Sequence, residues 1–186
     1  MRRLLDGLYG ASGALAALFV LAIALLVMAQ VTLNIVDRLA VMLGGSAPGL
    51  TIPSYSDFTG FFLAAASFLA LAHTLRSGDH IRVTLLTGRL AAGPRRTIEI
   101  LTVALALLVT LFIGYYLVAL VLESLEYGDL SSGMIAVPIW IPQSFVAAGV
   151  AVLAIALADE LQGQLRGRAP SWGDESTDAA GTGEQA

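Results

Sequence analysis

The amino-acid sequence predicts an all-α integral membrane protein with four transmembrane helices. Its 186 residues are 57% hydrophobic and only 13% charged, whereas a soluble domain carries about a quarter charged residues. The apolar residues gather in four long runs, and each run is close to the roughly 20 residues that a helix needs to cross a bilayer. Strands that cross a membrane show short segments of alternating hydrophobicity instead, and this sequence has none.

The four predicted spans cover about residues 8–36, 57–76, 97–122 and 135–161. Backbone N–H and C=O groups in lipid must find partners within the chain, so each span is expected to be a helix. The first span follows Arg2 and Arg3, as a signal peptide would. It is much longer than the 7–15 apolar residues of a signal, so we expect a retained helix.

The ten arginines are distributed unevenly, and the chain has no lysine. Two stand at the amino end, five between the second and third spans, and two in the carboxyl tail, while only Arg38 follows the first span. Basic residues favour cytoplasmic loops. Both termini and residues 76–96 are therefore predicted to be cytoplasmic, and residues 37–56 and 123–136 periplasmic.

Two domains are expected. Residues 1–165 form the four-helix membrane domain. Residues 166–186 form an acidic cytoplasmic tail, and their small, polar composition cannot bury enough apolar surface to fold, which predicts disorder.

The spans carry little that could do chemistry. The absence of cysteine excludes disulfides, thiolate metal sites and cysteine nucleophiles. An ionisable side chain deep in a membrane usually marks a transport path, but the acidic residues stand at span ends: Asp57, Glu99, Glu123, Asp159 and Glu160. We therefore expect no catalytic, cofactor or metal site, and no substrate or sodium site within this chain. His73 and His80 are near neighbours in one segment and cannot easily clamp one haem.

The densest charge cluster is "LRSGDHIRVTLL", residues 75–86, directly after the second span. Gly78 can adopt the left-handed conformation that ends a helix, and Asp79 can cap a new one. The mixture of apolar residues and arginines that follows suits a short interfacial helix between the second and third spans.

This cluster also carries a family resemblance. Arg76, Gly78, His80, Ile81 and Val83, placed after the second of four spans, resemble the small membrane subunit, called the DctQ type, of tripartite ATP-independent periplasmic (TRAP) transporters. Three further stretches support the resemblance, which covers about residues 10–162. Their matching residues are Asn34 and Arg38 at the end of the first span, Asp57 at the start of the second, and Pro138, Trp140 and Pro142 at the start of the fourth.

The resemblance implies a multi-pass protein of the bacterial inner membrane that works with a large permease subunit and a periplasmic substrate-binding protein. The large subunit would hold the sodium and substrate sites, and this chain would brace it and help dock the binding protein. Substrates would be organic acids such as dicarboxylates. The matching residues, with Asp79, are then a structural or subunit-interface motif. The residues alone also leave open a membrane-anchor or cytochrome-type subunit of a redox complex.

Overall fold

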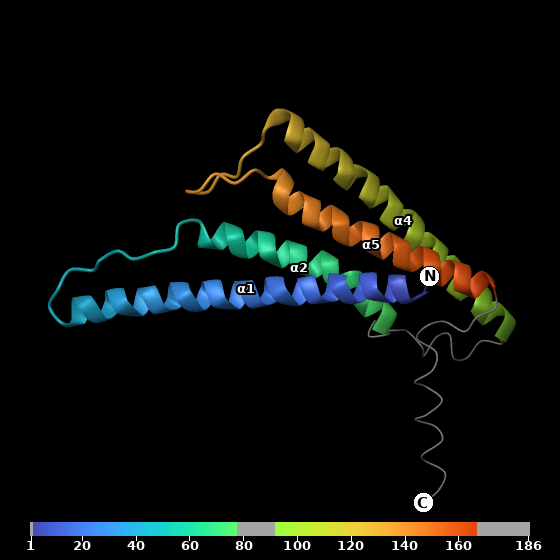
Figure 1. Ribbon diagram of the computed structural model, residues 1–186, viewed down its shortest axis with the longest axis horizontal. Helices are drawn as coiled ribbons and strands as arrows, with labels where there is room; N and C mark the ends of the chain where they lie inside the picture. The colour runs from blue at the N-terminus through green and yellow to red at the C-terminus, as the bar shows by residue number, and fades with distance from the viewer. Residues whose placement is uncertain (1, 78–91, 167–186) are drawn as a thin grey trace, which may run out of the picture.

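The computed structural model describes residues 2–77 and 92–166, and this part of the chain is helical apart from its connecting loops (Figure 1). Its helices are α1 (Arg2–Met42), α2 (Tyr55–Ser77), α4 (Ala92–Tyr127) and α5 (Trp140–Leu165). All four are long and apolar enough to cross a membrane. The described residues form no sheet, since their β pairing is an isolated bridge between Leu130 and Pro138. The predicted all-α class is confirmed.

Helix α1 is longer than its apolar run. Its 41 residues give a length of about 60 Å, roughly twice the thickness of a bilayer's hydrocarbon core. The helix includes Asp6 near one end and Asp37 near the other, so its charged termini extend past the predicted span. It ends where Gly44 takes a φ of 81°, the left-handed conformation that terminates helices.

Helix α5 begins at Trp140, later than the apolar run that starts near Ile135. The preceding residues fold back on the end of α4 instead. The Ser131 amide donates to the Val137 carbonyl at 2.8 Å, and the Ile139 amide donates to the Asp129 carbonyl at 3.0 Å. Pro138 lacks an N–H and disfavours a helical residue before it, so the helix starts after this proline.

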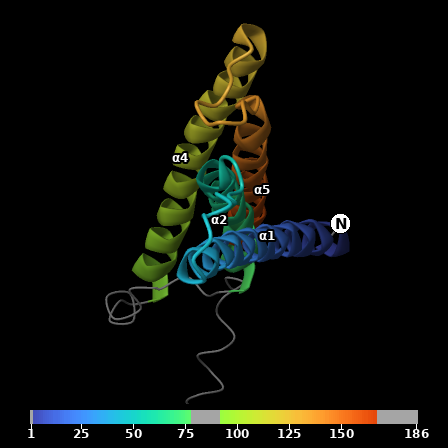
Figure 2. The same ribbon diagram turned by 90° about the vertical axis from the view of Figure 1, so that its left-hand side faces the viewer.

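The helices pack in a row, in the order α1, α2, α5 and α4. Helices α2 and α5 therefore occupy the middle of the row, and α1 and α4 form its sides (Figure 1). Helices that follow one another along the chain run in opposite directions. The axis of α1 is strongly inclined to the axes of α4 and α5 (Figure 2). Large apolar side chains on α1 and α4 are therefore left exposed, including Leu18 and Leu25 on α1 and Leu105 and Leu108 on α4.

Small residues allow the middle of the row to pack closely. Ala65 and Ala72 of α2 are fully buried. Gly149 of α5 lies so close to α2 that an added Cβ would stand 2.5 Å from the carbonyl carbon of Phe68. Ser12 of α1 is also buried and donates to the Leu69 carbonyl of α2 at 2.6 Å. Close backbone approach and interhelical hydrogen bonds are what hold helices together in lipid.

Candidate functional site

Polar contacts between helices gather at the two ends of the row. At one end, called here the Arg76 end, α1 and α4 begin and α2 and α5 finish (Figure 1). At the other, the loop end, α1 and α4 finish and α2 and α5 begin. Both ends are candidate sites for holding the helices together, because side chains of separate helices and loops make ion pairs or hydrogen bonds there.

The Arg76 cluster consists of Asp6, Tyr9, Arg76 and Asp159 and joins three helices. The Arg76 guanidinium of α2 lies 2.8 Å from the Asp6 carboxylate of α1 and 3.4 Å from the Asp159 carboxylate of α5. Its central carbon stands 5.9 Å from the centre of the Tyr9 ring, within the range of a cation–π contact. The three charged side chains are partly exposed, so each ion pair is worth about 1 kcal/mol or less.

A second polar group at this end connects α5 to α4. The Arg96 guanidinium of α4 donates to the Gln164 backbone carbonyl of α5 at 3.0 Å. The Gln164 side chain is buried and donates to the Glu160 carboxylate, one turn earlier on α5, at 3.1 Å. All four helices therefore take part in polar contacts at the Arg76 end.

At the loop end, Gln30 of α1 ties the following loop to the helix. The side chain is 5% exposed, and its oxygen accepts a hydrogen bond from the Ile52 amide at 2.8 Å. Its nitrogen donates to the side-chain oxygens of Asn34 at 3.1 Å and Thr51 at 3.2 Å. The Asp37 carboxylate accepts from the Leu50 amide at 3.3 Å. These contacts are neutral or involve one charge, unlike the ion pairs at the opposite end.

The loop before α2 also meets the loop before α5. Ser54 has a φ of 55°, an unusual conformation for a residue with a side chain. Its hydroxyl accepts a hydrogen bond from the Ile135 amide at 2.9 Å. Gly133 lies against the side chains of Ser54 and Asp57, and an added Cβ at Gly133 would collide with the Asp57 carboxylate. A side chain at position 133 would therefore require the side chains of Ser54 and Asp57 to move away from this junction.

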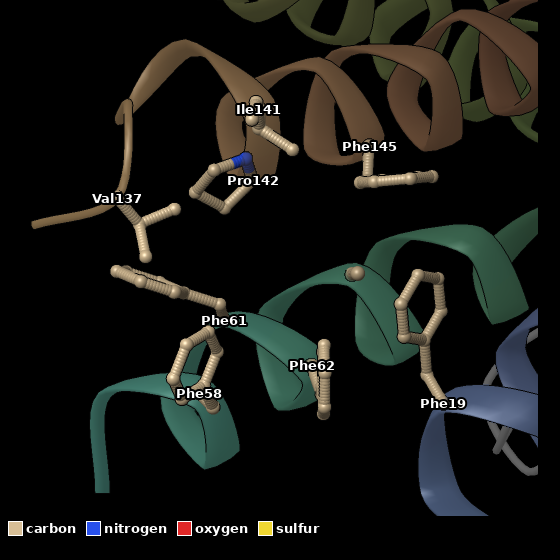
Figure 3. Close-up of a pocket in the computed structure, with 9 residues that line it drawn as sticks. Phe19, Phe58, Phe61, Phe62, Val137, Ile141, Pro142 and Phe145 are labelled. Atoms are coloured by element: carbon tan, nitrogen blue, oxygen red, sulfur yellow. The ribbon is translucent and has the colours of Figure 1, made fainter. Parts of the chain in front are cut away.

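Behind the junction lies an apolar cavity of about 100 Å³. Phe58, Phe61 and Phe62 of α2 form one wall, and residues at the start of α5 face them (Figure 3). The Phe19 ring of α1 stands 5.1 Å from the Phe145 ring of α5 and 5.5 Å from the Phe62 ring. These edge-to-face and tilted contacts bring three helices together by ring packing.

The structure distributes the sequence-predicted residues over both ends. Arg76 forms the centre of the Arg76 cluster, while Gly78, Asp79, His80, Ile81 and Val83 lie outside the described residues, as do the predicted interfacial helix and residues 167–186. At the loop end, Asn34 bonds to Gln30, Asp57 lies beside Gly133, and Pro142 lines the cavity. The remaining predicted residues are Arg38, exposed near the end of α1, Pro138, which pairs with Leu130, and Trp140, which begins α5.

Sequence reasoning missed several residues that make these contacts, which are Asp6, Tyr9, Gln30, Ser54, Arg96, Gly133 and Gln164. Gln30 carried a signal, because it is one of the few polar side chains in the first apolar run. Asp6 and Tyr9 gave a weaker indication. Such residues are common where a span meets the membrane surface, so their presence there does not by itself predict a contact with another helix. Only the packing of α1 on α2 and α5 shows that both meet Arg76.

Comparison with known proteins identifies the family. The family model for "Tripartite ATP-independent periplasmic transporters, DctQ component" matches residues 27–167. One relative is the ectoine TRAP transporter small permease protein TeaB of Halomonas elongata, which is 24% identical over 156 residues that cover 82% of this chain and 81% of the relative. No solved structure matches the chain.

The chain belongs to the DctQ family. It is a small permease subunit of a TRAP transporter, a multi-pass membrane protein and not an enzyme. At the level of the family, its partners are a large permease and a periplasmic binding protein. This membership excludes the redox-subunit alternative. His73 instead contributes to helix packing, since its ring lies directly against Gly13 of α1.

Proposed function

We propose that this chain is a rigid brace for the large permease of a sodium-driven, binding-protein-dependent importer of organic acids such as dicarboxylates. The chain orders and supports the large subunit, which carries the sodium and substrate sites. It also helps to dock the periplasmic binding protein. The TeaB relative belongs to an ectoine transporter, and in this proposal the partner proteins, not this chain, select the substrate.

The observation that carries this proposal is the separation of polar and apolar surfaces. Hydrogen bonds and ion pairs fasten the helices at both ends, whereas the middle of every span is free of ionisable side chains. A subunit that moved an ion or an acid through itself would need polar groups near the bilayer centre. This chain instead offers apolar outer faces on α1 and α4, which suit lipid and a membrane partner.

The predicted orientation places the Arg76 end in the cytoplasm and the loop end in the periplasm. The uneven distribution of arginines supports it. In this orientation, the exposed Glu123 and Glu126 at the end of α4 face the periplasm, where they can meet the binding protein. The segment from Arg76 to Val83 then forms a joint on the cytoplasmic side that contacts the large subunit.

Reconstitution tests the proposed division of labour. The purified chain is placed alone in liposomes with an inward sodium gradient and radiolabelled dicarboxylates outside. We expect no accumulation above that of empty liposomes, and accumulation only when the large permease and the binding protein are added. Gradient-dependent accumulation by this chain alone contradicts the proposal.

A further inference from the structure

Two buried residues at the Arg76 end, Gln164 and Tyr9, carry a side-chain oxygen without a hydrogen-bond partner among the described residues, and Tyr9 is the less exposed of the two. Only 2% of the residue is exposed, and its hydroxyl has no hydrogen-bond partner among the residues that the structure describes. A buried hydroxyl without a partner costs stability, and nearly all such groups in proteins bond to the chain or to an ordered water.

A small cavity lies beside this residue. Its volume is about 10 Å³, and its lining includes Tyr9 of α1, Arg76 of α2 and Glu160 of α5. A cavity of roughly this volume accommodates one water molecule, provided that two to four polar partners surround it. The cavity is too small for a lipid headgroup or a side chain from another protein.

The three polar residues offer complementary hydrogen-bonding groups. A tyrosine hydroxyl donates and accepts, a carboxylate accepts, and a guanidinium has five N–H donors. The ion pairs of Arg76 engage one nitrogen each with Asp6 and Asp159, so donors remain for a further acceptor. A water molecule can accept from Arg76 and donate to Glu160 while it bonds to the Tyr9 hydroxyl.

We propose that this cavity binds one structural water that bridges Tyr9, Arg76 and Glu160. The water connects the Arg76 cluster to the chain of contacts from Glu160 through Gln164 to Arg96. The two polar groups thereby form one hydrogen-bonded network that crosses all four helices at the Arg76 end. Tyr9 lies outside residues 27–167, which the family model matches.

The direction in which one substitution changes the unfolding equilibrium constant tests whether the water is present. In the full-length chain in mild detergent, Tyr9→Phe removes the hydroxyl and keeps the ring. If the hydroxyl bonds to a water, the unfolding equilibrium constant rises about three- to tenfold. If the hydroxyl is buried without a partner, its removal leaves the constant unchanged or lowers it, and the proposal is overturned. Tyr116→Phe, on the exposed face of α4, is the matched control and should change little.

A double-mutant cycle tests the bridge to α5. Tyr9→Phe is combined with Glu160→Leu, and both are compared with the single variants. Glu160→Leu removes the hydrogen bond from Gln164 whether residue 9 is Tyr or Phe, so this loss cancels when the two effects of Glu160→Leu are subtracted. The remaining coupling free energy reports the interaction between residues 9 and 160. We expect the two effects to depart from additivity by about twofold or more in the unfolding constant. Additive effects overturn the bridge, as does an experimental density map that resolves ordered waters but shows none at this cavity.

Discussion

The two ends of the helix row are fastened by different chemistry. At the Arg76 end, charged side chains from α1, α2 and α5 meet across the helices. At the loop end, the fastening depends on side chains such as Gln30 and Ser54 that bind the backbone of connecting loops. Among the described residues, ion pairs therefore fasten the first end, and hydrogen bonds to loop backbone fasten the second.

The middle of the row is held together by close packing of small residues, in contrast to the ion pairs and loop hydrogen bonds at the two ends. Gly149 and the buried alanines of α2 bring α2 and α5 into backbone contact, and this contact holds the pairs α1–α2 and α4–α5 together. Both ends therefore depend on the middle. Their separate contributions can be measured only when the middle is intact.

Which end faces the cytoplasm is tested by an all-or-none experiment. Single cysteines are introduced at Ser46 and Ser131 near the loop end, and at Thr87 between α2 and α4. In whole cells, an impermeant thiol reagent should label the first two positions and leave the third unlabelled until the membrane is permeabilised. The reverse pattern would show that the Arg76 end faces the periplasm.

The largest effect on stability is expected from Gly149→Ala. The added methyl group would press on the backbone of Phe68 and Leu69, which cannot rotate away as a side chain can. We expect a loss of about 2–3 kcal/mol, measured by thermal unfolding in detergent, and reduced yield of the complex with the large permease. Gly163→Ala in the same helix is the control, because nothing lies within 4 Å of the added atom. Equal behaviour of the two variants would contradict the close contact.

Arg76→Gln should have the next largest effect, and it should depend on salt. The variant leaves the Asp6 and Asp159 carboxylates without their shared cation, at a cost of about 1–2 kcal/mol at low ionic strength. Screening by salt should weaken the wild-type cluster, so the difference between the two proteins should shrink as salt is raised. Arg76→Lys should recover only part of the loss, because one ammonium cannot reach two carboxylates as a guanidinium does. A salt-independent loss would mean that Arg76 acts by packing.

The smallest effect is expected from Gln30→Leu at the loop end. The variant removes the acceptor for the Ile52 amide, at a cost of about 1 kcal/mol, and the cost should not change with salt. Faster hydrogen exchange at the Ile52 amide should accompany it. The control is Thr32→Val on the same helix, since the exposed Thr32 hydroxyl donates to the Met28 carbonyl one turn back in α1. Unchanged exchange at Ile52 in the Gln30 variant would show that the loop is held by other contacts.

The sequence was sufficient to predict the helices, because a span is defined by length and hydrophobicity along the chain. The sequence also shows directly that the charged residues lie away from the centres of the spans. The motif that includes Arg76 indicated the family. Helix boundaries were less predictable. The apolar run from Ile135 could have been helical, but backbone pairing of Ser131 with Val137 shifts the start of α5 to Trp140.

The partners of the polar residues could be decided only by the tertiary structure. Asp6, Arg76 and Asp159 are separated by many residues in the sequence, and each one alone is typical of a span end at a membrane surface. They meet because small residues allow α1, α2 and α5 to approach closely, and because helix packing sets which faces adjoin. The same packing buries Tyr9 beside Glu160 and places Gln30 under the loop. A pairing across helices depends on distances in space, which hydropathy along a single chain does not encode.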